Sequence, residues 1–111
     1  MSALAEKIRR ARESRVPVGD FFFVIRRPTE IEMIDFSKSR NTVDLIRFVV
    51  GWEKVKELDL IPGGDGHPAP FDAEACLEWL KDRSDLLVPV VNAVIEAYQA
   101  HQASLEAAAK N

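Results

Sequence analysis

The sequence predicts a mainly α-helical α+β fold, in which one short strand or β-hairpin packs against four or five helices. Only the run Asp20–Arg27, "DFFFVIRR", is rich enough in aromatic and β-branched residues to predict a strand. Most of the remaining chain carries apolar residues at helical spacing behind capping residues. At 111 residues, residues 1–111 are expected to form a single domain with one modest hydrophobic core.

The N-terminal segment predicts a helix over residues 3–14 with a thin apolar stripe. Ser2 is a suitable N-cap, and Pro17 with Gly19 would end the helix. The stripe consists of Leu4, Ile8 and Ala11. Because so narrow a stripe buries little surface, residues 1–15 are expected to be loosely docked.

Two more helices are predicted in the middle of the chain. Thr29 and Glu32 form a capping-box pair at the start of "PTEIEMIDF". Thr42 is the expected cap of "VDLIRFVV", whose apolar residues surround most of its circumference. A helix of this kind is usually central to a core, and Gly51 is expected to stop it.

A loop and a helix follow. The segment Asp59–Pro70 holds three glycines and three prolines, which predicts a loop. Asp72 is the expected N-cap of the next helix, and Cys76 lies on the apolar side of that helix.

The last helix is the longest predicted element. Ser84 or Asp85 is its expected cap, Pro89 is expected near its first turn, and residues 106–111 are expected to fray. A seam with 4-3-4-3-4 spacing runs along it, formed by Leu87, Val91, Val94, Tyr98, His101 and Leu105. Either the seam packs within the chain, or part of it binds a partner helix or another subunit.

The residues predicted to bind a partner come from this seam and from the strand. They are Leu87, Val91, Val94, Tyr98 and Leu105, with Phe21 and Phe23 as a second candidate surface. Three adjacent phenylalanines alternate between the two faces of a strand, so one face is expected to need a cover.

Signatures of catalysis or metal binding are missing from the sequence. Asp65 and His67 lie in the glycine-rich loop, but the only other histidine is His101, and no H-x-x-H, C-x-x-C or phosphate-loop spacing occurs. Cys76 has no neighbouring base in its motif. We therefore predict no catalytic, cofactor-binding or metal-binding residues, no cofactor, and no enzymatic activity.

The charge distribution bears on nucleic-acid binding. Residues 1–50 carry ten Lys/Arg and seven Asp/Glu, a balance of +3, whereas residues 51–111 carry five and eleven, a balance of −6. The basic residues cluster in "KIRRARESR", which contains no aromatic residue for stacking on bases. Nucleic-acid binding is therefore disfavoured, although a regulator that uses Arg9, Arg10 and Arg12 as a basic arm stays an alternative.

The sequence also bears on location. The longest apolar run, Phe21–Ile25, is far shorter than a membrane helix requires, and the N-terminus has no apolar signal-peptide core. The single cysteine cannot form an internal disulfide. These features predict a cytoplasmic protein without a membrane partner.

Several motifs, taken in order, resemble a known family. They are "SALAEKIRRARE", "RRPTEIEMIDF", "FVVGWEKVKELD", "APFDAE" and "LKDRSDLL". Their order resembles that of the small tail assembly chaperones of long-tailed bacteriophages and prophages, the lambda G-like family. The resemblance covers most of the chain, and the "VVGW…PF" junction is its most specific part.

The resemblance implies a non-enzymatic chaperone in the bacterial host cytoplasm. Such a protein would bind the long helical tape-measure protein and possess affinity for tail-tube subunits, and it would self-associate into a homo-oligomer. The family often has an extended form made by −1 frameshifting, and Lys110-Asn111 can be encoded by the slippery heptamer A-AAA-AAC. The alternative is a small cytoplasmic adaptor that dimerises through its C-terminal helix.

Overall fold

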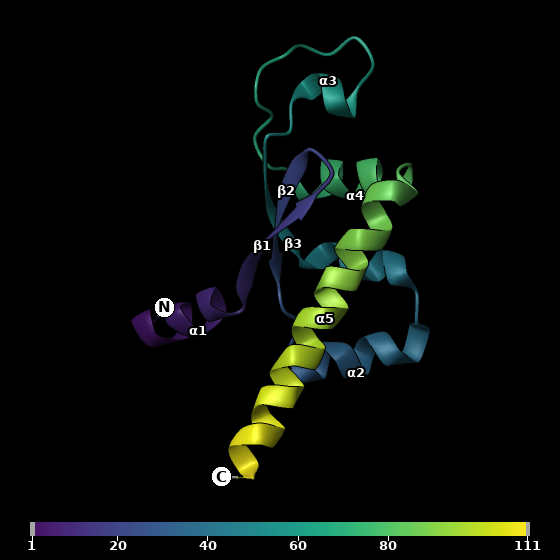
Figure 1. Cartoon of the computed structure of the whole chain (residues 1–111). Helices are drawn as coiled ribbons and strands as arrows, with labels where there is room; N and C mark the ends of the chain where they lie inside the picture. Colours follow the sequence, from purple (N-terminus) through teal and green to yellow (C-terminus); the bar gives the residue numbers. More distant parts are fainter. Residues whose placement is uncertain (1, 111) are drawn as a thin grey trace.

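Residues 2–110 are described by a computed structural model, in which a three-stranded sheet packs against helices (Figure 1). The elements in chain order are α1 (Ala3–Ala11), β1 (Glu13–Val18), β2 (Phe21–Arg26), α2 (Glu30–Ser39), the 3-10 helix η1 (Thr42–Phe48), β3 (Val49–Glu53), α3 (Glu57–Leu60), α4 (Ala73–Lys81) and α5 (Ser84–Ala109). Asn111, on which the frameshift hypothesis partly rests, lies outside the described residues.

The sheet is antiparallel in the order β1-β2-β3. β1 and β2 form a hairpin in register from Glu13 opposite Arg26 to Val18 opposite Phe21. Gly19 in the connecting turn has a φ of +59°, a conformation that glycine adopts without steric cost. The predicted strand is therefore the central one, with a partner on each side.

The predicted fold class, with one strand or hairpin, is wrong in its strand count, because the described residues form three strands. No strand was predicted over β1: Glu13 and Ser14 were assigned to the first helix, and Pro17 with Gly19 was expected to end that helix. Pro17 is tolerated here because β1 is an edge strand, where a missing N–H can face away from the sheet. The first helix consequently ends at Ala11 rather than at residue 14.

The third strand begins at Val49, so it takes the last two residues of a predicted helix and continues to Glu53. The 3-10 helix ends at Phe48, and the chain then pairs with β2 as β3, with a register irregularity opposite Val24 and Ile25. Gly51, predicted to stop a helix, lies within β3, where an added Cβ would stand 3.4 Å from the Val24 side chain. The N-cap of η1 is Asn41 rather than Thr42.

Several predicted helix starts are confirmed. The Ser2 hydroxyl accepts a hydrogen bond from the Ala5 N–H at 3.0 Å, and the Asp72 carboxylate accepts one from the Ala75 N–H at 2.9 Å. The capping box of α2 is also present, with Glu32 N–H donating to Thr29 and Thr29 N–H donating to Glu32. These are short-range interactions, which local sequence specifies.

The start of α5 differs from the prediction. Its N-cap is Arg83, which makes no side-chain capping hydrogen bond, although its guanidinium pairs with Asp85 at 2.8 Å. Pro89 lies inside the helix, beyond its first turn. The helix continues without interruption to Ala109, through much of the segment expected to fray.

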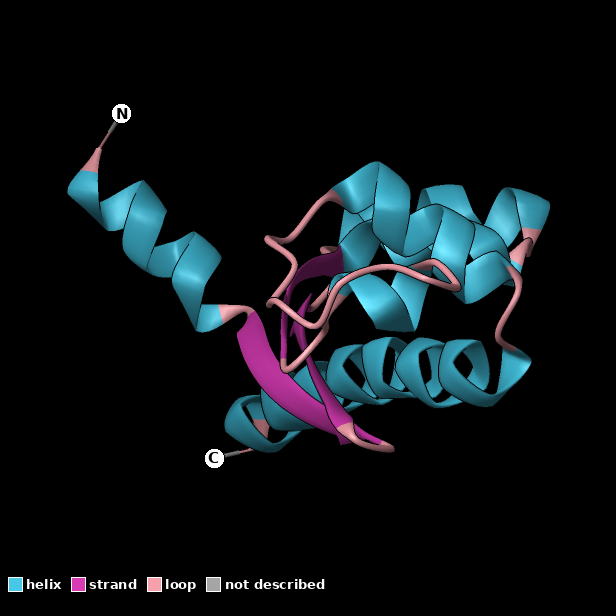
Figure 2. Ribbon diagram, turned by 90° about the horizontal axis from the view of Figure 1, so that it is seen from above, coloured by secondary structure: helices cyan, strands magenta, loops and turns pink. Residues whose placement is uncertain are grey.

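One hydrophobic core joins the sheet to η1, α4 and α5. Its fully buried members include Phe23, Phe48, Leu80 and Val90, one from each of these elements. The first helix contributes none of the buried residues. Figure 2 shows the hairpin crossing α5 at an angle, while α1 points away from the rest of the molecule.

Candidate partner-binding surface

The seam of α5 divides into a core half and a surface half. Val91 and Val94 are buried in the core, so neither presents a side chain to a partner in this fold. Leu87 and Tyr98 are half-buried, and Leu105 is 49% exposed. Of the predicted seam residues, these last three have surface available for binding.

Beyond Ala97, α5 leaves the core. Val94 is the last buried residue of the helix, which runs on to Ala109 as the projecting end seen at the C-terminus in Figure 1. The Gln102 amide donates to the Tyr98 hydroxyl at 2.9 Å, which fixes the Tyr98 ring along the helix. We call Tyr98 to Leu105 with the intervening turns the α5 tail. It presents Tyr98, His101 and Leu105 on one side.

The second predicted surface faces inward. Phe21 and Phe23 lie two residues apart and therefore share one face of β2, the face that packs on Trp79 of α4. Phe23 is fully buried, and Phe21 is half-buried with its ring centroid 5.1 Å from that of Trp79. Phe22, which lies between them, is on the opposite face, where the Arg15 guanidinium stands 3.5 Å from its ring centroid.

Trp52 holds the glycine-rich loop against the core. Its indole N–H donates to the Ala69 carbonyl at 2.8 Å, and its ring meets that of Phe71 edge-on at 5.0 Å. Trp52 also meets Trp79 edge-on at 5.9 Å between centroids. The "GW…PF" junction is thus an aromatic contact that closes the loop.

Asp65 and His67 belong to a local turn in this loop. The Asp65 carboxylate accepts the His67 N–H at 2.8 Å and lies 3.1 Å from the His67 Nδ1. Both side chains are largely exposed. Cys76 is 1% exposed, and burial raises the pKa of its thiol to about 12. Within residues 2–110, no group of three or more His, Cys, Asp or Glu side chains is arranged to hold a metal ion.

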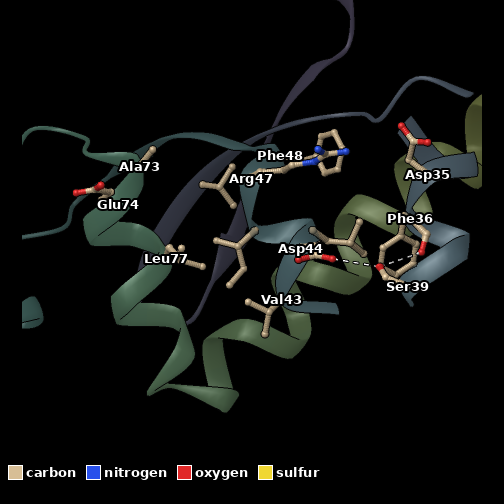
Figure 3. A pocket seen from close by; sticks show the side chains of 13 residues that line it. Asp35, Phe36, Ser39, Val43, Asp44, Arg47, Phe48, Ala73, Glu74 and Leu77 are labelled. Carbon is tan, nitrogen blue, oxygen red and sulfur yellow. Dashed lines mark hydrogen bonds between the residues drawn. The ribbon is translucent and has the colours of Figure 1, made fainter. Parts of the chain in front are cut away.

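A pocket of about 500 Å³ lies between α2, η1 and α4 (Figure 3). Its lining residues are Asp35, Phe36, Ser39, Val43, Asp44, Leu45, Ile46, Arg47, Phe48, Val49, Ala73, Glu74 and Leu77. In Figure 3, Leu77 reaches from α4 toward η1, and Phe36 faces the same space from α2. We call this pocket the acidic groove, because three carboxylates and one guanidinium are set around an apolar floor.

The carboxylates of the groove come from three elements. Asp35 is on α2, Asp44 on η1 and Glu74 in the first turn of α4. The Ser39 hydroxyl donates to Asp44 at 3.2 Å, and Lys38 lies 3.6 Å from Asp35 in an exposed pair. Three carboxylates face two cations, Arg47 in the lining and Lys38 beside Asp35, so the rim has a net charge of −1.

The N-terminal helix is the least buried element of the described chain. Leu4 is 68% and Ile8 48% exposed, and none of its residues is buried. Lys7, Arg9 and Arg10 make it basic, with Glu6 the one acidic residue. Exposed apolar side chains on a basic helix are typical of a surface that binds a partner.

No family model, curated protein or solved structure matches the chain. Among the described residues, no helix combines the length and the apolar character needed to cross a membrane.

Sequence reasoning missed the acidic groove. Phe36, Val43 and Leu77 are separated along the chain and meet only because β3 turns η1 toward α4. The exposed pair Ile31 and Ile34 was also missed, because α2 carries apolar residues on more than one side. No local pattern tells which side of such a helix faces the core.

Proposed function

We propose that this chain is a non-enzymatic tail assembly chaperone of a phage or prophage, acting in the cytoplasm of the bacterial host. In this proposal it binds the tape-measure protein reversibly and helps tail-tube subunits assemble around that protein. The motif order described above supports the family, and exposed apolar side chains support the activity. A chaperone for a long helical client needs apolar surface that stays accessible in its folded state.

One observation carries the proposal: the α5 tail extends past the core and still carries apolar and aromatic side chains on one side. A helix needs no exposed apolar side chain where nothing in the chain packs against it, and Leu105 is 49% exposed. Tyr98 and Leu105 therefore form the client-binding surface that we favour. An amphipathic client helix would lie alongside this surface.

The experiment is co-expression with a long helical tape-measure protein as the client. We expect the wild-type chain to keep the client soluble and Leu105→Asp to abolish this effect. Ala103→Asp is the matched control, because it places the same charge on the same exposed part of the helix but away from the seam. Equal solubility of the client with and without the wild-type chain would refute the proposal.

The adaptor alternative makes a different prediction. A chain that dimerises through the α5 tail without a client would lose its dimer in Leu105→Asp, and the tape-measure protein would stay insoluble with every variant. The extended form is tested separately by reading the codons of Lys110 and Asn111 and the overlapping −1 frame.

A further inference from the structure

We propose that α1 of one copy of this chain docks in the acidic groove of a second copy. The inference is independent of the proposed function, because it concerns contact between copies without a client. It starts from two exposed surfaces within residues 2–110: a basic helix with an apolar stripe and an apolar groove with an acidic rim.

Leu4, Lys7 and Ile8 lie on the same side of α1. Leu4 and Ile8 are one turn apart and both exposed. Lys7 follows Leu4 by three residues and is exposed, so one basic side chain of α1 lies beside the stripe. Arg12, the C-cap, follows Ile8 by four residues and is half-buried. A helix with this pattern presents aliphatic side chains to a groove and its charges to the rim of that groove.

The acidic groove offers the complementary surface. Its floor is formed by apolar side chains such as Val43 and Leu77, and its volume of about 500 Å³ is enough for two aliphatic side chains. Asp35 and Glu74 stand on opposite sides of it, as Figure 3 shows. Opposite charges at the rim favour encounter and set the orientation of the docked helix.

Among the exposed apolar side chains of residues 2–110, Leu4 and Ile8 are the ones carried by a basic helix. The exposed residues of α2 lie in a helix with Glu30, Glu32 and Asp35. Leu105 is followed directly by Glu106. Charge therefore selects α1 as the occupant of the groove over the other exposed apolar segments.

The fold directs α1 away from the groove of its own chain. Only Arg12 separates the end of α1 from the start of β1, and the Arg12 carbonyl accepts a hydrogen bond from the Arg27 N–H at 2.7 Å. The α2 helix, which forms one wall of the groove, also starts close to this point, at Glu30. Figure 1 shows α1 and α2 leaving this end of the sheet in opposite directions. The α1 helix of a second copy can therefore occupy the acidic groove, which the chain's own α1 does not reach.

The test measures self-association of the purified full-length chain, free of nucleic acid, by sedimentation velocity over a range of concentrations. We expect association above about 10 μM, weakened at least tenfold at high salt because rim charges contribute. Leu4→Asp with Ile8→Asp should be monomeric. Ser2→Asp with Ala3→Asp adds the same two charges away from the stripe and should weaken association by less than about threefold.

Complementation identifies the two surfaces. Asp35→Lys with Glu74→Lys reverses the rim and should also give a monomer, since both side chains are exposed and neither supports the core. Mixing this groove variant with the Leu4→Asp, Ile8→Asp variant should restore a heteromer, because one partner keeps α1 and the other keeps the groove. Unchanged thermal unfolding of each variant shows that folding is intact.

Three results would overturn the proposal. They are a wild-type chain that stays monomeric up to about 1 mM, an α1 variant that associates like the wild type, and a mixture of the two variants that stays monomeric. A monomeric wild-type chain is also the result expected if α1 docks within its own chain or serves only to bind nucleic acid. None of these results affects the test with the tape-measure protein.

Discussion

Glu32 joins the sheet to α2 at the level of a single side chain. It accepts two hydrogen bonds from the Arg26 guanidinium, at 2.9 and 3.3 Å, and one from the Thr29 N–H at 2.9 Å. Burial by itself raises the pKa of this carboxyl, but the hydrogen bonds from Arg26 and Thr29 outweigh burial and lower the pKa to about 2. The ionised form is therefore favoured in the folded state.

Replacing Glu32 by Gln should destabilise the fold by about 1–2 kcal/mol near neutral pH, because a charge-assisted pair is lost. Since the folded pKa lies below the unfolded value of about 4.5, this stabilisation is present above pH 4.5 and is lost as the pH falls toward 2. Urea unfolding of the wild type and of Glu32→Gln should show a smaller difference in unfolding free energy at acidic pH than at neutral pH. A difference that stays constant with pH would contradict the assignment.

The thiol of Cys76 should be unreactive in the folded protein. Its burial and raised pKa keep the thiolate population very small at about pH 8. Iodoacetamide is expected to label Cys76 only after denaturant is added, as read by mass spectrometry. Rapid labelling of the native chain would show that α4 opens readily from the core.

At the scale of elements, the N-terminal half of α5 packs in the core and its C-terminal half is exposed at the surface. Val94→Asp places a carboxylate at a fully buried position and should unfold the chain. Leu105→Asp lies at an exposed position and should change the unfolding free energy by less than about 0.5 kcal/mol. Circular dichroism melting separates the two, and a folded Val94→Asp protein would remove Val94 from the core.

The loop after α3 supplies a second test at this scale. A Cβ added to Gly64 would stand 2.8 Å from the Glu57 carbonyl carbon and oxygen, so Gly64→Ala forces the backbone of α3 to shift. We expect a loss of about 1–3 kcal/mol. Gly66→Ala is the matched control, because the nearest atom to its added Cβ is 3.7 Å away. Equal melting temperatures for the two variants would show that the loop adapts freely.

Features that depend on residues close together in the sequence were predicted, and features that depend on distant residues were not. Ser2, Asp72 and the Thr29–Glu32 capping box act over three residues, and each was predicted correctly. β1 and β3 become strands only by pairing with β2. Their own residues did not predict strands, because Pro17 in β1 and Gly51 in β3 are typical of the ends of helices. The acidic groove depends on three elements at once and has no sequence signature.

The partner-binding residues show the same limit. The seam of α5 has one period throughout, and the sequence does not mark where the core beneath it ends. Val94 and Leu105 therefore belonged to one predicted surface, although only Leu105 is exposed. Phe21 and Phe23 were grouped correctly on one face, but the helices that cover that face come from distant parts of the chain.

The molecule as a whole is extended. Its Cα radius of gyration is 15.6 Å, and its dimensions are 55 × 33 × 24 Å. A compact chain of this length would have a radius of gyration of about 13 Å. The excess comes from the two projecting segments, α1 and the α5 tail, which together enlarge the surface without enlarging the core (Figure 1).

The aromatic contact between Trp52 and Trp79 has an optical consequence. Both tryptophans of the chain lie in this one cluster, with their centroids 5.9 Å apart. Their fluorescence therefore monitors a single place, where the sheet, the loop and α4 meet. Emission will follow melting of the interior but stay insensitive to events at α1 or the α5 tail. Binding of a partner to either projecting helix must be followed with an added fluorophore. A tryptophan spectrum that stays constant during such a titration shows that the core is undisturbed.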